Sequence, residues 1–208
     1  MSLWGRVFAA IYDRMMAGTE EAGLSDRRHA LLGVAHGAVI EIGAGTGVNL
    51  GHYPQSGIDE LVMVEPEEPM ARRLERKAAE STLPVRVVRA PAEELPFPDA
   101  SFDVAVSTLV LCTVNDQPRA LAELRRVLKP DGTLLFLEHV RADDPRVARW
   151  QDRLLPLWVR CGHGCHCNRP TLDTITSSGF DVRDVEHTRL PKAPPIVRPM
   201  IVGTAARG

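Results

Sequence analysis

The chain has 208 residues, of which 44% are hydrophobic and 25% are charged, and its formal net charge is -2 at pH 7. These values are typical of a globular domain and exclude a collagen-like or intrinsically disordered chain. The balanced charge gives no electrostatic reason to expect binding to nucleic acid. No apolar run reaches the roughly 18 residues that span a membrane, and no signal peptide is recognisable, so we expect one cytoplasmic domain.

The amino-terminal part of the sequence predicts two helices. Apolar spacing indicates an amphipathic helix over residues 2–17, and Ser25 is a candidate N-cap for a second helix. We interpret residues 1–36 as a helical lid, in which Tyr12 either closes over a pocket or only docks the helix on the domain.

From residue 37 to residue 208, short apolar runs alternate with amphipathic segments. The expected strands are residues 38–42, 61–64, 85–88, 102–107, 133–137, 180–186 and 196–204. The expected helices run through Met70, Leu74 and Ala78, and over residues 118–128, 147–159 and 171–178. Strands that alternate with helices predict an α/β domain with a mostly parallel sheet. The last two strands have no helix between them, which predicts an antiparallel hairpin.

The sharpest motif is Glu41-Ile-Gly-Ala-Gly-Thr-Gly47, directly after the first strand. Glycines permit a tight turn and the close approach of a ligand to the backbone. Val48 stands where a dinucleotide-binding loop has its third glycine, which disfavours an NAD-dependent oxidoreductase. Glu65 ends the second strand, and a carboxylate there can accept hydrogen bonds from both hydroxyls of a ribose. The motif predicts a nucleoside site; the alternatives are a structural turn and a surface carboxylate.

These motifs, in this order, resemble those of the class I S-adenosylmethionine-dependent methyltransferases, including the ubiquinone/menaquinone-biosynthesis group. The segments that carry this resemblance are residues 41–47, Glu65, 92–99, 101–106 and 128–134. A closer similarity, to thiol S-methyltransferases of the methyltransferase-like 7 type, is carried by residues 107–114, 138–140, 164–169 and 197–203. The similarity departs at the amino terminus, because those proteins begin with a membrane-anchoring segment that this sequence does not show.

The resemblance implies a Rossmann-like, seven-stranded class I methyltransferase sheet with an antiparallel last strand, and S-adenosyl-L-methionine as cofactor with S-adenosylhomocysteine as product. It assigns these residues to the cofactor: Glu41, Gly43, Ala44, Gly45, Thr46, Gly47, Asn49, Glu65, Pro66, Ala92, Glu93, Ser107, Thr108 and Leu109. Within this set, Glu41 would accept from the amino group. Ala92 and Glu93 would border the adenine, or simply begin a short helix. Ser107 to Leu109 would face the sulfonium methyl.

The implied reaction is methyl transfer to a small molecule, and the favoured acceptor is a small apolar thiol. His139, at the end of the fifth expected strand, is the candidate proton acceptor or acceptor-orienting residue, because an imidazole titrates near neutral pH. The alternative is a structural histidine. A thiol needs no strong base, since its ordinary pKa is about 8.5. The other candidate acceptor-site residues are Tyr12, Cys112, Asn168 and Arg169.

Other acceptors remain open at this point: a quinone or natural-product precursor methylated at oxygen or carbon, or a phospholipid amine. A non-catalytic cofactor-binding subunit is a further alternative. The expected partner is the small-molecule acceptor, without nucleic acid and without an integral membrane segment. A weak contact between the amino-terminal helix and a membrane surface stays open.

Three of the four cysteines, Cys161, Cys165 and Cys167, lie within seven residues together with two histidines. This cluster suggests a metal site, but no second pair of ligands at the spacing of a structural zinc site completes it. We therefore predict no metal. A disulfide from Cys161 to Cys165 or Cys167 on oxidation stays open.

Overall fold

The structure is a computed structural model that describes residues 14–208. Tyr12 and most of the helix predicted over residues 2–17 lie outside the described residues. Within the described part, no helix is both long and apolar enough to cross a membrane.

The amino-terminal segment is helical through the point where the sequence predicted a break. Residues 14–19 are helical and continue through a π-helical turn, η1 (Glu20–Leu24), into α2 (Ser25–Leu32). Ser25 has helical dihedral angles and makes no cap, so the predicted N-cap is wrong. The chain reaches Ser25 already coiled, and the change of direction occurs at Gly23, whose φ is 118°.

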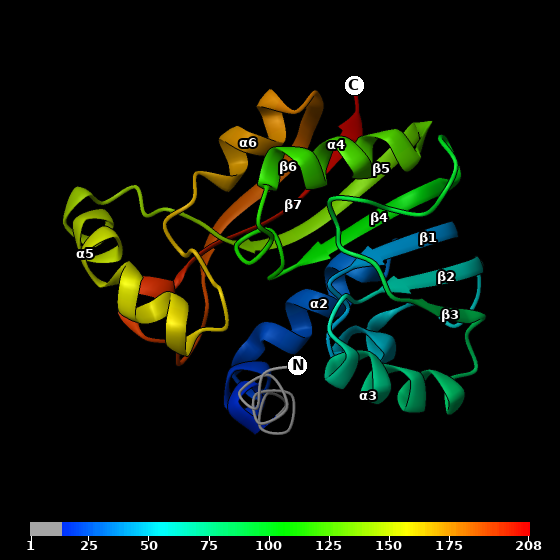
Figure 1. The fold of residues 1–208 in the computed structure, drawn as a ribbon, viewed down its shortest axis with the longest axis horizontal. Coiled ribbons are helices and arrows are strands. Elements are labelled where there is room, and N and C mark those ends of the chain that lie inside the picture. The colour runs from blue at the N-terminus through cyan, green and yellow to red at the C-terminus, as the bar shows by residue number, and fades with distance from the viewer. Residues whose placement is uncertain (1–13) are drawn as a thin grey trace.

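All seven strands form a single sheet (Figure 1). They are β1 (Gly37–Ile42), β2 (Ile58–Val64), β3 (Val85–Val88), β4 (Phe102–Thr108), β5 (Leu128–His139), β6 (Phe180–Arg189) and β7 (Pro199–Arg207). Their order is β3-β2-β1-β4-β5-β7-β6, and β7 runs antiparallel to both of its neighbours. The predicted sheet, with its antiparallel last strand, is confirmed.

The boundaries of β7 differ from the prediction. Its start moves from residue 196 to Pro199, because Pro195–Val197 forms a short 3-10 helix, η3. Proline favours the first turn of a helix, since its ring fixes φ and it has no N–H to leave unpaired. The apolar run from residue 196 is therefore divided between a turn and a strand.

Helices cover both faces of the sheet (Figure 1). They are α2, α3 (Glu68–Ala79), α4 (Gln117–Val127), α5 (Pro145–Cys161) and α6 (Thr171–Ser177), with a 3-10 turn η2 (Val48–His52). Residues of α4 and α6 pack with Phe136 in one core, and residues of α2 and α3 pack with Leu137 in the other. Helix α5 lies beyond β6 and β7 and contributes Trp158 to the margin of the second core.

The alternation of side chains along the strands sorts the polar residues at the carboxyl ends of β4 and β5. Ser107 and Glu138 face each other on the side covered by α4. Thr108 faces the opposite side, where it contacts Arg28 of α2. The adjacent residues Ser107 and Thr108 of the predicted site therefore lie on opposite faces of the sheet.

Candidate active site

The glycine loop after β1 combines strained backbone with one open position. Gly43, Gly45 and Gly47 have φ values of 55°, 58° and 77°, in the left-handed region that favours glycine. A Cβ on Gly43 would lie 2.5 Å from the Val110 side chain, and one on Gly47 would lie 2.8 Å from Leu74. A Cβ on Gly45 would meet nothing closer than 3.9 Å. Gly45 is therefore the position that leaves room for a ligand.

Glu65 follows β2 and points to this open position. One carboxylate oxygen accepts the Gly45 N–H at 2.9 Å, and the other accepts the Glu67 N–H at 2.9 Å. Burial raises the pKa of Glu65 above its ordinary value, and the two N–H groups offset part of that rise. A carboxylate has about four acceptor positions, so each oxygen keeps one for a ligand hydroxyl. Gly45 and Glu65 lie together as the sequence predicted, and the contact of Glu65 with a ribose stays a prediction.

Glu41 lies at the carboxyl end of β1 within a network of the protein's own donors. The Tyr53 hydroxyl donates to it at 2.6 Å, and Asn49 Nδ2 donates at 2.9 Å. Burial raises the pKa of Glu41 from 4.5 to about 7. Because both oxygens are already hydrogen-bonded, its predicted contact with a ligand amino group stays a prediction.

Arg28 of α2 completes this network, and the sequence analysis missed it. Its Nη1 donates to Asn49 Oδ1 at 2.8 Å and to Thr108 Oγ1 at 3.0 Å, while its Nε pairs with Glu20 at 3.1 Å. The side chain is 4% exposed. The signal was its spacing, because Arg28 shares a helix face with the buried Leu24, Leu31 and Leu32.

Glu138 of β5 holds the loop that follows β4. Its Oε1 accepts the Ser107 hydroxyl at 2.6 Å and the Val110 N–H at 3.0 Å, while the N–H groups of Leu111 and Cys112 also stabilise the carboxylate. Ser107, predicted to face a methyl group, is thus engaged with Glu138 on the α4 side. The sequence analysis singled out His139 and passed over Glu138, although both belong to the same short motif.

Burial raises the pKa of Glu138 from 4.5 to about 7. The folded chain therefore holds this proton more tightly than the unfolded chain, and the stabilisation is complete below pH 4.5 and declines towards pH 7. We expect Glu138→Gln to remove this decline, so that over this range stability shifts by about 3 kcal/mol in favour of the variant. Urea unfolding at acidic and mildly alkaline pH measures it. A constant offset from altered hydrogen bonds is acceptable, but parallel pH profiles would contradict the prediction.

His139 is buried on the other face of β5. Burial lowers its pKa from 6.5 to about 4, although backbone hydrogen bonds with Val197 and Pro199 favour the charged ring. Its Nδ1 is buried without a hydrogen-bond partner. The imidazole is therefore neutral at pH 7 and holds an added proton weakly. The catalytic role predicted for His139 stays a prediction, and its position suits orientation better than proton transfer.

Leu109 is the residue of the predicted set with unusual backbone geometry. Its φ is 60°, a left-handed value that is rare for a residue other than glycine. The Leu109 N–H donates to the Leu137 carbonyl at 2.7 Å, which holds the turn in place at the carboxyl end of β4. Strain of this kind concentrates at functional sites.

Glu93, predicted to border the adenine, makes its hydrogen bonds within the protein, and Ala92 lies beside it. The Glu93 carboxylate accepts the N–H groups of Asn115 and Asp116 at 2.7 and 3.2 Å, ahead of α4. Ala92 beside it is buried. Glu93 therefore fixes the loop between β4 and α4, and its contact with an adenine ring stays a prediction.

The predicted acceptor residues Asn168 and Arg169 lie in the loop between α5 and α6. Asn168 Nδ2 donates to Asp152 at 2.8 Å, and Arg169 Nη1 donates to the Leu111 carbonyl at 2.7 Å. Arg169 thus reaches the loop that follows β4, whereas Asn168 is directed to α5. Only Arg169 is placed against a segment next to the glycine loop.

The cysteines that cluster in the sequence lie in different environments in the structure. Cys112, Cys165 and Cys167 are buried, Cys161 is exposed, and all four are free thiols. Cys112 and Cys165 form a side-chain hydrogen bond, which raises the pKa of Cys112 well above its ordinary value. Among residues 14–208, no group of three or more His, Cys, Asp or Glu side chains is arranged to hold a metal ion. Cys165 therefore contacts Cys112, which is far from it in the sequence.

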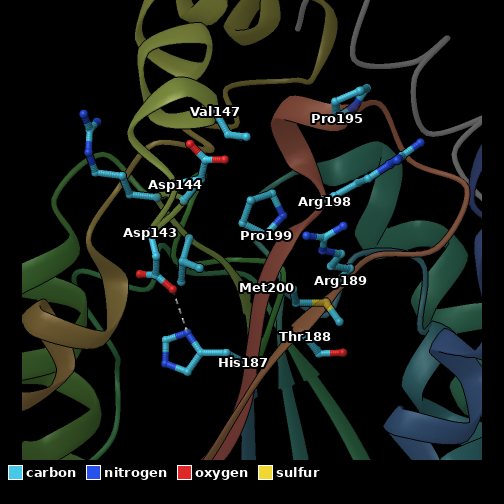
Figure 2. Close-up of a pocket in the computed structure, with 13 residues that line it drawn as sticks. Asp143, Asp144, Val147, His187, Thr188, Arg189, Pro195, Arg198, Pro199 and Met200 are labelled. Atoms are coloured by element: carbon cyan, nitrogen blue, oxygen red, sulfur yellow. Dashed lines mark ion pairs between the residues drawn. The ribbon is translucent and has the colours of Figure 1, made fainter.

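A cavity of about 330 Å³ opens beside the carboxyl end of β5 (Figure 2). Val140, Asp143, His187, Arg198 and Met200 are among the residues that line it. His187 points towards Asp143, and the two form an ion pair at 3.6 Å. No residue that the sequence assigned to the cofactor or the acceptor lines this cavity.

The segments that match known proteins include the residues of the candidate site. A family model described as a methyltransferase domain matches residues 40–136. Human thiol S-methyltransferase TMT1A is 31% identical over 204 residues, which cover 96% of this chain and 83% of that protein. The ubiquinone/menaquinone biosynthesis C-methyltransferase UbiE of Hahella chejuensis is 44% identical over 68 residues, 33% of this chain and 27% of that protein.

A solved structure agrees with the fold. A SAM-dependent methyltransferase from Thermotoga maritima matches with a TM-score of 0.71 at 24% identity, over 98% of each chain. Together, the matched ranges contain the glycine loop, Glu65 and the end of β4.

Proposed function

This chain belongs to the class I S-adenosylmethionine-dependent methyltransferases, and we propose that within this family it methylates a small, apolar thiol. The enzyme class and the cofactor follow from the family match and from the similarity to TMT1A. The family match leaves the identity of the methyl acceptor open.

The observation that carries the thiol acceptor is the extent of the similarity. The match to thiol S-methyltransferase TMT1A covers 96% of this chain, so it runs through the segments after β5. The match to UbiE covers 33% of this chain. A match of that length supports the shared cofactor site and carries little about the acceptor. C-methylation of a quinone is therefore the second candidate.

In this proposal, residues of the glycine loop, β2 and α2 bind the ribose and the methionine part of the cofactor. S-adenosylmethionine carries an electrophilic methyl group on a sulfonium sulfur, which a thiolate attacks as the bond from the methyl group to the sulfonium sulfur breaks. Glu65 accepts from the ribose hydroxyls, and Gly45 gives the ligand room. Arg28, within the predicted lid of residues 1–36, would attract the methionine carboxylate, because its guanidinium carries a positive charge beside Asn49 and Thr108.

The ionisation of the groups near β5 agrees with a thiol acceptor. His139 has a pKa of about 4 and is a weak proton acceptor at neutral pH. A free thiol has a pKa near 8.5 and ionises in part without help, whereas an alcohol needs a strong base. The chain's own residues then orient the thiolate and exclude water from it.

The proposal is tested by measuring S-adenosylhomocysteine with purified protein, S-adenosylmethionine and a panel of acceptors. The panel contains alkyl and aryl thiols, phenols, quinols and a phospholipid amine, and Glu65→Ala serves as the control for cofactor-dependent turnover. We expect turnover with the apolar thiols. Turnover with quinols and none with thiols would replace the proposal by its second candidate. Cofactor binding without turnover of any acceptor in the panel would favour a specialised natural-product acceptor or a non-catalytic subunit over the thiol.

The pH dependence of the reaction separates a base from an orienting residue. We expect kcat/KM for a thiol to rise with pH towards the thiol's own pKa, in the unmodified enzyme and in His139→Gln alike. The variant should lose a similar factor at every pH, because the role of His139 is orientation. A loss confined to low pH, and recovered where the thiolate forms unaided, would instead identify His139 as the proton acceptor.

A further inference from the structure

The outer face of α5 joins exposed apolar side chains to unpaired positive charge. Trp150 is 54% exposed and Leu157 is 64% exposed, and the two residues lie seven positions apart on one face of the helix. Arg146, Arg149, Arg153 and Arg160 are exposed on the same side, at spacings of three, four and seven residues. Trp150 and Leu157 thus stand two helical turns apart, with the charged Arg153 between them on the same face.

The charge of this face is not neutralised by neighbouring side chains. Among the described residues, none of the four arginines forms an ion pair. The acidic residue of α5, Asp152, accepts both Nη atoms of Arg141 at 2.7 and 2.8 Å and the Asn168 amide at 2.8 Å. The Arg153 guanidinium lies 5.7 Å from the centre of the Trp150 ring, which keeps it beside the apolar residues. The face therefore has a net positive charge and an apolar stripe along one edge.

Helix α5 is also placed where a flat partner can reach it. It stands at the side of the molecule beyond β6 and β7, away from α3 (Figure 1). The inner face is held by Gln151, which is fully buried and whose amide donates to the carbonyls of Val140, Cys167 and Ile196. The outer face is thus presented by a helix that is anchored on its other side.

We propose that the outer face of α5 docks on a lipid surface that contains anionic headgroups. The arginines bind the headgroup phosphates and carboxylates, and Trp150 and Leu157 enter the boundary with the acyl chains. A nucleic acid satisfies the charge and can stack a base on Trp150, but it gives no place for the aliphatic Leu157, so the pair of apolar residues favours a lipid. The chain leaves α5 at Cys161 and reaches the loop after β4 at His166, whose N–H donates to the Cys112 carbonyl at 2.7 Å. A short loop therefore links the carboxyl end of α5 to the segment that contains the predicted acceptor residues Cys112 and Arg169.

The test is co-sedimentation of the full chain with phosphatidylcholine vesicles, with and without phosphatidylserine. We expect binding to the anionic vesicles that weakens as salt is added. Arg149→Glu/Arg153→Glu should weaken it by about 30-fold or more, since each basic residue near an anionic surface is worth about fivefold in affinity. Trp150→Ala/Leu157→Ala should also weaken it, while leaving the salt dependence in place.

The matched control is Arg72→Glu/Arg76→Glu on α3, which makes the same change of charge on an exposed helix elsewhere on the molecule. It should bind vesicles as the unmodified chain does. Thermal unfolding of every variant shows that it is folded. Three results would overturn the proposal: no sedimentation of the unmodified chain, an equal loss in the α3 control, or binding that is indifferent to Trp150 and Leu157 and is matched by an oligonucleotide.

Discussion

Glu65→Ala should weaken the binding of S-adenosylmethionine by about 1–3 kcal/mol, or about 5- to 150-fold in Kd. The substitution removes the proposed acceptors of two ribose hydroxyls and also leaves the Gly45 and Glu67 N–H groups without their partner. The loss is large because Glu65 is only 5% exposed, so water replaces the carboxylate poorly. Isothermal titration calorimetry with the purified protein measures this change.

The matched control for this experiment is Glu60→Ala on β2, the strand that Glu65 follows. Glu60 pairs with Arg86 at 2.8 Å on the surface, and its removal should leave the affinity for the cofactor unchanged. A cofactor analogue without the ribose 2′-hydroxyl gives a second check, because it should lose less on Glu65→Ala than the full cofactor does. Equal losses for the two ligands would show that Glu65 supports the glycine loop without contacting the ribose.

Much of the fold could be predicted because the signals were local. The short apolar runs, such as residues 102–107, and the turn residues between them indicate strands whatever their partners are. Boundaries were weaker where two signals compete. At residue 25 a capping residue stands within a chain that is already helical, and at residues 195–197 prolines favour a turn inside an apolar run.

The glycine loop and Glu65 were within reach of the sequence because each lies at the end of an apolar strand, and parallel strands end at one edge. The partners of these residues were not. Tyr53 reaches Glu41 across 12 positions, and Arg28 reaches Thr108 across 80. Contacts at such separations depend on how α2 and η2 pack on the sheet, which a periodicity does not contain. Adjacent residues also diverged, since Glu138 and His139 face opposite sides of β5.

Arg28→Leu should lower the free energy of unfolding by about 3–5 kcal/mol, the usual cost of removing one partner from a buried ion pair. Leucine fills part of the volume but leaves Glu20, the Asn49 carbonyl oxygen and the Thr108 hydroxyl without their charged donor. It also removes a positive charge that lowers the pKa of Glu41, so that carboxyl becomes harder to ionise. Urea unfolding measures the change.

The neighbouring substitution Arg27→Leu shows why this cost belongs to burial rather than to the loss of an arginine. Arg27 pairs with Glu186 at 2.8 Å, but the two side chains are 33% and 60% exposed, so its loss should cost no more than about 1 kcal/mol. Arg28→Lys keeps the charge without the planar guanidinium, which bonds Glu20 through Nε and both Asn49 and Thr108 through Nη1, and it should fall between the two. If Arg28→Leu were as stable as Arg27→Leu, the hydrogen bonds of the buried Arg28 would contribute no more to the free energy of unfolding than a surface ion pair does. A large loss of stability in Arg28→Leu, with weaker cofactor binding in the folded Arg28→Lys variant, would instead show that Arg28 contributes both to the packing of α2 and to the cofactor site.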